Sequence, residues 1–98
     1  MWRNALVGLL LLTGCGGTIV VSGIEVYERH WLQAADAVAT RASFDMSCPR
    51  EQLRLFLLHK QGRHPDQIGV QGCGQRVTYV RPDLNKQLWI ANVEASQR

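Results

Sequence analysis

The stretch Ala42-Ser43-Phe44-Asp45-Met46-Ser47-Cys48-Pro49 marks the point at which the chain changes its hydrophobic period. Before it, apolar residues recur every three or four positions and so fall on one side of a helix. These residues are Ile24, Tyr27, Trp31, Ala35, Val38 and Ala42. Pro49 disfavours the α conformation at Cys48, so a helix should stop there. The pattern predicts a helix over residues 23–43 that ends before Cys48-Pro49.

After Pro49 the apolar period falls toward two, which is typical of strands. Leu53, Leu55 and Leu57, for example, alternate with Arg54, Phe56 and Leu58. The turn clusters 61–66 and 81–85 separate strands that we predict at 52–60, 67–72, 75–80 and 87–93. The segment Ile19-Val20-Val21 could be a further short strand or a tether. The predicted fold class is α+β, with one N-terminal helix packed on a small antiparallel sheet of three to four strands.

The N-terminus has the composition of a targeting segment. Residues 1–4 contain one basic residue, Arg3, and residues 5–12 form an apolar run of eight. A membrane-spanning helix needs about 20 apolar residues, so this run is too short to cross a bilayer. It fits the hydrophobic region of a secretory signal.

The residues that follow, Leu12-Thr13-Gly14-Cys15, resemble the lipobox of bacterial lipoproteins. The resemblance implies cleavage before Cys15, lipidation of that cysteine, and attachment of the protein to a membrane of the cell envelope. It divides the chain into a signal peptide (1–14), a lipidated tether (15–23), a small α+β domain (24–94) and a polar tail (95–98). Gly16, where an Asp would imply retention in the inner membrane, favours the outer membrane.

With Cys15 assigned to lipid, Cys48 and Cys73 remain as a pair in an oxidising compartment, where disulfides persist. A bridge closing this loop would stabilise a small domain by about 3 kcal/mol. Loss of Arg3 with the signal peptide lowers the formal net charge from +3 to +2. Because the chain has no basic run, we expect no nucleic-acid partner.

The body of the chain is similar to uncharacterised small bacterial lipoprotein domains that share two short motifs. One is Phe44-Asp45, two further residues and Cys48-Pro49; the other is Gly72-Cys73-Gly74 followed by Thr78-Tyr79. Members of that group often carry a further cysteine where this chain has Arg81. The resemblance supports the fold and a single disulfide, but it implies no activity.

Two chemical alternatives depend on the cysteines and histidines. Cys48, Cys73, His59 and His64 could form a tetrahedral metal site, and Cys73 could act in redox or nucleophilic chemistry with a histidine as base. A structural disulfide with exposed turn histidines explains the same residues without either. We therefore expect no catalytic residue, no metal and no cofactor.

The remaining functional signal is an apolar strand face. If Leu88 and Ile90 point toward the helix, then Trp89, Ala91 and Val93 form an exposed apolar patch, which is typical of partner surfaces. We predict a lipid-anchored envelope lipoprotein with a non-enzymatic binding or structural role. Its partners would be the membrane and an envelope protein or cell-wall component. The alternative is a small periplasmic redox or metal-handling lipoprotein.

Overall fold

The computed structural model describes residues 17–92. The predicted signal peptide, Cys15, Val93 and the polar tail lie outside this range. The described elements are β1 (Thr18–Val21), β2 (Ile24–Tyr27), α2 (Glu28–Met46), the short 3₁₀ helix η1 (Arg50–Gln52), β3 (Arg54–Gln61), β4 (His64–Gly72), β5 (Gln75–Val80) and β6 (Ile90–Asn92). None of the helices in this range has the length and hydropathy needed to cross a membrane.

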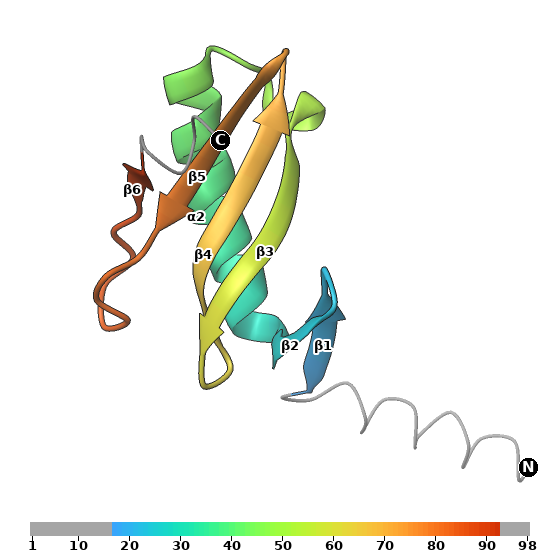
Figure 1. Ribbon diagram of the computed structural model, residues 1–98, viewed down its shortest axis with the longest axis vertical. Coiled ribbons are helices and arrows are strands. Elements are labelled where there is room, and N and C mark those ends of the chain that lie inside the picture. Colours follow the sequence, from blue (N-terminus) through green and yellow to red (C-terminus); the bar gives the residue numbers. More distant parts are fainter. Residues whose placement is uncertain (1–16, 93–98) are drawn as a thin grey trace, which may run out of the picture.

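The architecture is α+β, as predicted, but it contains two antiparallel sheets. β3, β4, β5 and β6 form a four-stranded sheet in that order, and β1 pairs with β2 in a separate hairpin. Figure 1 shows α2 lying along one face of the larger sheet, with the hairpin beside the start of the helix. The predicted single sheet is therefore only approximate.

The predicted start of the helix at residue 23 is wrong. Ser22 and Gly23 have positive φ angles of 53° and 81°, which produce a two-residue turn between β1 and β2. Such turns match the twist of paired strands. Residues 24–27 therefore pair with residues 18–21, and α2 begins at Glu28. The helix also continues three residues beyond the predicted end, to Met46, where Ser47 adopts a left-handed conformation.

The core lies between α2 and the four-stranded sheet. From α2 it receives Ala34, Val38, Ala42 and Met46, and from the sheet it receives Leu57, Ile68, Val70 and Tyr79. Val38 and Ala42 belong to the predicted stripe, and Ala34 is adjacent to its member Ala35. The four core positions of α2 recur every four residues. Because alanine has a short side chain, the helix axis can approach the sheet closely. Val26 of β2 is also fully buried, so the hairpin contributes to the same core.

The strands differ from their predicted bounds mainly at the turns. The breaker-rich segment 61–66 forms a tight turn at Gly62-Arg63, so β4 already begins at His64. β3 carries a bulge between Leu57 and Lys60 where it pairs with β4. β5 has the predicted bounds, whereas only Ile90–Asn92 of the predicted strand 87–93 pair with a neighbour.

The disulfide between Cys48 and Cys73 is confirmed, with 5.9 Å between the Cα atoms. It joins the end of α2 to the turn between β4 and β5. Gly72 makes this contact possible, because a Cβ there would lie 3.0 Å from the backbone oxygen of Gln52 and 3.1 Å from Sγ of Cys48. The bridge and the close backbone approach together hold the helix end on the sheet.

Candidate functional site

The face of the four-stranded sheet that points away from α2 is the candidate site. No element within residues 17–92 covers it (Figure 1). The pairing register places residues directly across the strands on the same face. The outer face carries Arg54, Phe56 and Leu58 of β3; Gln67, Gly69 and Gln71 of β4; Arg76, Thr78 and Val80 of β5; and Ile90 and Asn92 of β6.

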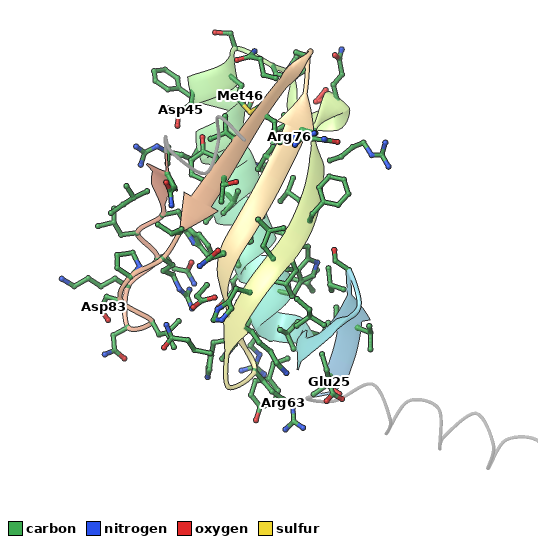
Figure 2. All side chains as sticks on the ribbon, viewed as in Figure 1. Glu25, Asp45, Met46, Arg63, Arg76 and Asp83 are labelled. Atoms are coloured by element: carbon green, nitrogen blue, oxygen red, sulfur yellow. A yellow bond between two sulfur atoms is a disulfide. The ribbon has the colours of Figure 1, made fainter. Side chains whose placement is uncertain are left out.

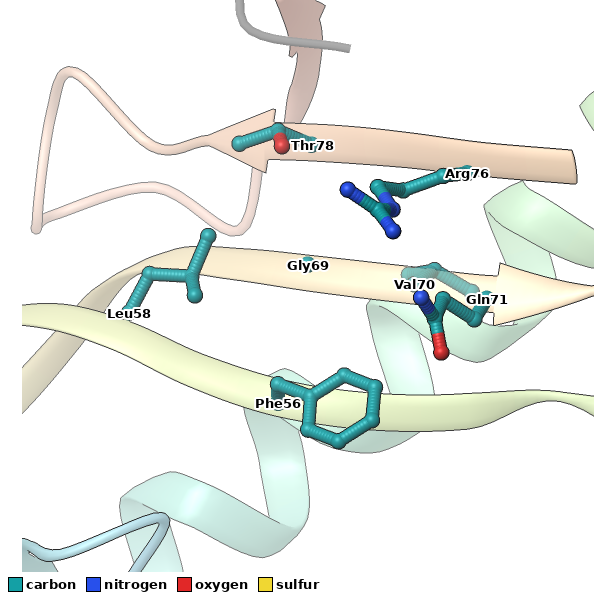
Figure 3. Close-up of a pocket in the computed structure, with 7 residues that line it drawn as sticks. All are labelled: Phe56, Leu58, Gly69, Val70, Gln71, Arg76 and Thr78. Atoms are coloured by element: carbon teal, nitrogen blue, oxygen red, sulfur yellow. The ribbon is translucent and has the colours of Figure 1, made fainter. Parts of the chain in front are cut away.

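A groove of about 380 Å³ runs over the middle of this face. Figure 3 shows Phe56 and Leu58 on one side of Gly69 and Arg76 on the other. Gly69 leaves the floor open: a Cβ there would lie 3.3 Å from a methyl group of Leu58. The groove therefore exists because β4 has no side chain at Gly69, between the large side chains of Phe56 and Leu58 on β3 and the shorter Thr78 on β5.

Two arginines and a glutamine form one row across the groove end. Arg54, Gln71 and Arg76 lie opposite one another on three adjacent strands. With its amide oxygen turned toward Arg76, Gln71 accepts two hydrogen bonds of 3.2 Å from the guanidinium. The guanidinium of Arg54 lies 5.8 Å from the ring centroid of Phe56, within the range of cation–π contact.

The outer face is cationic. Among its eleven residues two are arginines and none is acidic. Apolar side chains of β3 lie beside these charges, so the face offers both hydrophobic contact and guanidinium donors. Such donors bind carboxylates in a bidentate geometry. The arrangement suits a partner that is anionic and partly apolar.

The predicted exposed patch of Trp89, Ala91 and Val93 is wrong for Trp89 and Ala91, which both face the core. Ala91 pairs with Tyr79, whose side chain is in the core, and so Ala91 and Trp89 point inward. Trp89 is 3% exposed, whereas Leu88 and Ile90 are 53% and 45% exposed. The two faces of this segment are thus the reverse of those predicted. Val93 lies outside the described residues.

Burial of Trp89 is completed by a buried arginine. The guanidinium of Arg81 lies 5.3 Å from the Trp89 ring, and the backbone N–H of Arg81 donates to the carbonyl of Asp66. Burial lowers the pKa of Arg81, and the carboxylates of Asp66 and Asp83 oppose this effect. Nε of Arg81 has no hydrogen-bond partner among the described residues. This is a packed structural contact between Arg81 and the Trp89 ring.

The proposed four-residue metal set is not assembled. His59 Nδ1 lies 2.8 Å from a carboxylate oxygen of the buried Asp66, whereas His64 contacts a different histidine. Cys48 and Cys73 are bonded to each other at the opposite end of β4. Residues 17–92 contain no group of three or more histidine, cysteine or acidic side chains that could hold a metal ion.

His64 instead pairs with His30, a contact that the sequence analysis did not predict. Their Nδ1 atoms are 2.6 Å apart, and the ring of Tyr27 packs edge-on against both. Burial lowers the pKa of His30, and so do the nearby charges of His64 and Arg81. The helical spacing could have indicated that His30 faces inward. His30 lies four residues before the buried Ala34 and therefore falls on the same face of α2.

Comparison with protein-family models, with curated proteins and with solved structures finds no match to this chain.

Proposed function

We propose that this chain is a lipid-anchored protein of the bacterial envelope with a non-enzymatic binding role. The observation that carries the proposal is the position of Leu12-Thr13-Gly14-Cys15 relative to the domain. β1 begins at Thr18, three residues after Cys15, and the backbone N–H of Glu28 donates to the carbonyl of Gly17. A lipid on Cys15 would therefore be connected to the packed domain by a very short segment.

The disulfide supports an envelope location. Cystine bridges persist in oxidising compartments, which in bacteria lie outside the cytoplasmic membrane. Cys48 is almost completely buried and joins two elements that are 25 residues apart in the sequence. In the proposal this bridge is structural, and Gly16 directs the protein to the outer rather than the inner membrane.

The proposed binding surface is the outer sheet face, and its occupant is an acidic peptide segment of another envelope protein. Charge complementarity supports this choice, because Arg54 lies beside the ring of Phe56 on this face and none of the described residues of the face is acidic. An extended segment could place its apolar side chains beside Phe56 and a carboxylate on Arg54. Desolvated guanidinium–carboxylate pairs confer specificity, and Phe56 supplies apolar contact area.

The anchor is tested by growth with labelled palmitate. The wild-type protein and the double variant Cys48→Ser/Cys73→Ser are expected to take up label, because both keep Cys15. Cys15→Ser is expected to take up none and to leave the membrane fraction. Equal labelling of the wild type and Cys15→Ser would overturn the proposal.

The binding face is tested by replacing Phe56 with a photo-crosslinking amino acid in cells. We expect a crosslinked protein whose contact peptide is rich in Asp and Glu. Its yield should fall several-fold with Arg54→Glu and stay unchanged with Lys86→Glu, a matched charge reversal in the exposed loop before β6. A glycan product, or a yield that Arg54→Glu leaves unchanged, would contradict the proposed partner.

A further inference from the structure

One end of the molecule combines the start of β1, the start of α2 and the turn between β3 and β4. Thr18 pairs with Tyr27 there, and the backbone N–H of Tyr27 donates to the carbonyl of Arg63 at 3.2 Å. Figure 2 shows Arg63 and Glu25 together at this end. We call it the hairpin end. The disulfide lies at the opposite end of β4, about 25–30 Å away for a strand of nine residues.

Two hollows flank Tyr27 at the hairpin end. One, of about 250 Å³, is lined by Gly17, Tyr27, Arg29 and His30. The other, of about 420 Å³, is lined by Tyr27, Lys60, Gly62, Arg63 and His64. Among the described residues, neither lining contains an acidic side chain. The ring between them is 38% exposed, so an aromatic side chain stands between two basic depressions.

The charges around the hollows are unequal in number. The cations are Arg29, Lys60 and Arg63, and the nearby carboxylates are Glu25 and Glu28. Glu25 is already engaged, because its carboxylate accepts hydrogen bonds from Thr18 and Arg63. These contacts lower the pKa of Glu25, which therefore stays ionised and neutralises Arg63. With Glu28 counted against Arg29 and Lys60, one net positive charge remains at this end. Nζ of Lys60 also donates to the backbone carbonyl of Glu25 at 2.9 Å, and the N-terminus of α2 adds partial positive charge.

The short distance to Cys15 would fix the depth of the hairpin end in a membrane. Gly17 forms a wall of the first hollow and is two residues from Cys15, so the chain between them spans at most about 7 Å. The headgroup layer of one leaflet is about 5–8 Å thick. Acyl chains on Cys15 would thus bring Tyr27 and Arg29 to the level of the phosphates.

We propose that the hairpin end is a headgroup-binding surface, with Tyr27 in the interface and Arg29 and Lys60 on the phosphates of anionic phospholipids. The inference rests on the proposed lipid anchor and adds an orientation to it. The long axis of β4 then points away from the membrane, with the disulfide end farthest out. The outer sheet face lies alongside this axis, where no element within residues 17–92 covers it.

The chain contains two lysines, Lys60 at the hairpin end and Lys86 in an exposed loop. Acetylation of Lys60 relative to Lys86 therefore reports whether the hairpin end contacts the membrane. The acylated protein, verified by mass, is placed in vesicles containing phosphatidylglycerol, in pure phosphatidylcholine vesicles, and in detergent micelles. A membrane-impermeant acetylating reagent is then applied. We expect the labelling ratio of Lys60 to Lys86 to be about fivefold lower in the anionic vesicles than in micelles. Protection should be weaker in phosphatidylcholine.

Two charge reversals complete the test. Arg29→Glu should return the ratio toward the micelle value, whereas Arg54→Glu, an equal charge change on the outer sheet face, should leave the protection intact. An acylated protein whose Lys60 reacts equally in anionic vesicles and micelles would overturn this inference alone. A protein isolated without acyl chains would instead overturn the proposed function on which it depends.

Discussion

The hydroxyl of Tyr79 donates a 2.7 Å hydrogen bond to Oδ2 of Asp45, linking β5 to the last turn of α2. The same carboxylate oxygen accepts from Nε of Arg41 at 3.2 Å. The observed role of Asp45 is to satisfy the one polar atom of a large core side chain, which would otherwise be buried without a partner.

Tyr79 is expected to make stability depend on pH in the alkaline range. Its burial, and then the hydrogen bond and charge of Asp45, raise the pKa of this phenol above the ordinary value of 10.0. The unfolded chain therefore loses the proton first. The contribution is fully present below about pH 10 and is lost as pH rises. Tyr79→Phe should flatten this decline and lower the free energy of unfolding at neutral pH by roughly 1–2 kcal/mol.

Urea unfolding at neutral and alkaline pH measures both effects of Tyr79→Phe. The matched control is Tyr27→Phe, which removes a hydroxyl from a more exposed ring. The control should keep the alkaline decline of the wild type. If Tyr79→Phe declined with pH as steeply as the control, the buried phenol would not be its source.

The disulfide should carry a large share of the stability of this small domain. Replacing both Cys48 and Cys73 by Ala frees a loop of 25 residues in the unfolded chain. We expect a loss of about 3 kcal/mol in the free energy of unfolding, measured by urea titration. Reductant should lower the wild-type midpoint and leave that of the double variant unchanged. A wild-type midpoint insensitive to full reduction would contradict this role.

Two glycines on β4 should respond differently to the addition of one methyl group. In Gly72→Ala the new Cβ would lie 2.8 Å from a methyl of Leu53 and 3.0 Å from the backbone oxygen of Gln52, so backbone must shift. We expect a destabilisation of about 1–3 kcal/mol. In Gly69→Ala the nearest group is a methyl of the exposed Leu58, which can move, so stability should change little.

Thermal unfolding of the two glycine variants compares them directly. Gly69→Ala also narrows the groove, so it should reduce crosslinking from Phe56 while the fold persists. Equal losses of thermal stability in both variants would show that the approach of β4 to the disulfide is not the tight contact described above.

The histidine pair should weaken the protein in acid. Burial, followed by the charges of His64 and Arg81, lowers the pKa of His30 below its ordinary value of 6.5. As pH falls below about 6.5, the unfolded chain binds a proton that the folded chain rejects, so stability falls. His30→Gln should make the thermal midpoint less sensitive to pH between about 7 and 5. Gln33→Ala, an exposed change on the same helix, should keep the sensitivity of the wild type.

The faces of β6 illustrate what could not be read from local sequence. Leu88, Trp89 and Ile90 are all apolar. A strand with Trp89 facing the core and a strand with Leu88 and Ile90 facing the core therefore fit the sequence equally well. Only the pairing of Ala91 with Tyr79 decides that Trp89 is inside, since a shift of one residue would exchange the faces. The hairpin was missed for a related reason: Ile24 and Tyr27 fit both a helical stripe and a short strand. The His30–His64 contact joins residues 34 positions apart, which no local pattern reports.

The amino-acid sequence by itself determined the α+β class, the main strands of the larger sheet and the pairing of Cys48 with Cys73. The class and the strands depend on periodicity and on breakers such as Pro49, which are local, and the pairing depends on the lipobox resemblance, which assigns Cys15 to lipid and leaves two cysteines. The tertiary structure alone decided that residues 24–27 leave the helix, that the apolar residues around Trp89 turn inward, and that a cationic groove opens over Gly69. Each of these depends on which strands lie beside one another, because burial and charge clustering are properties of neighbours in space.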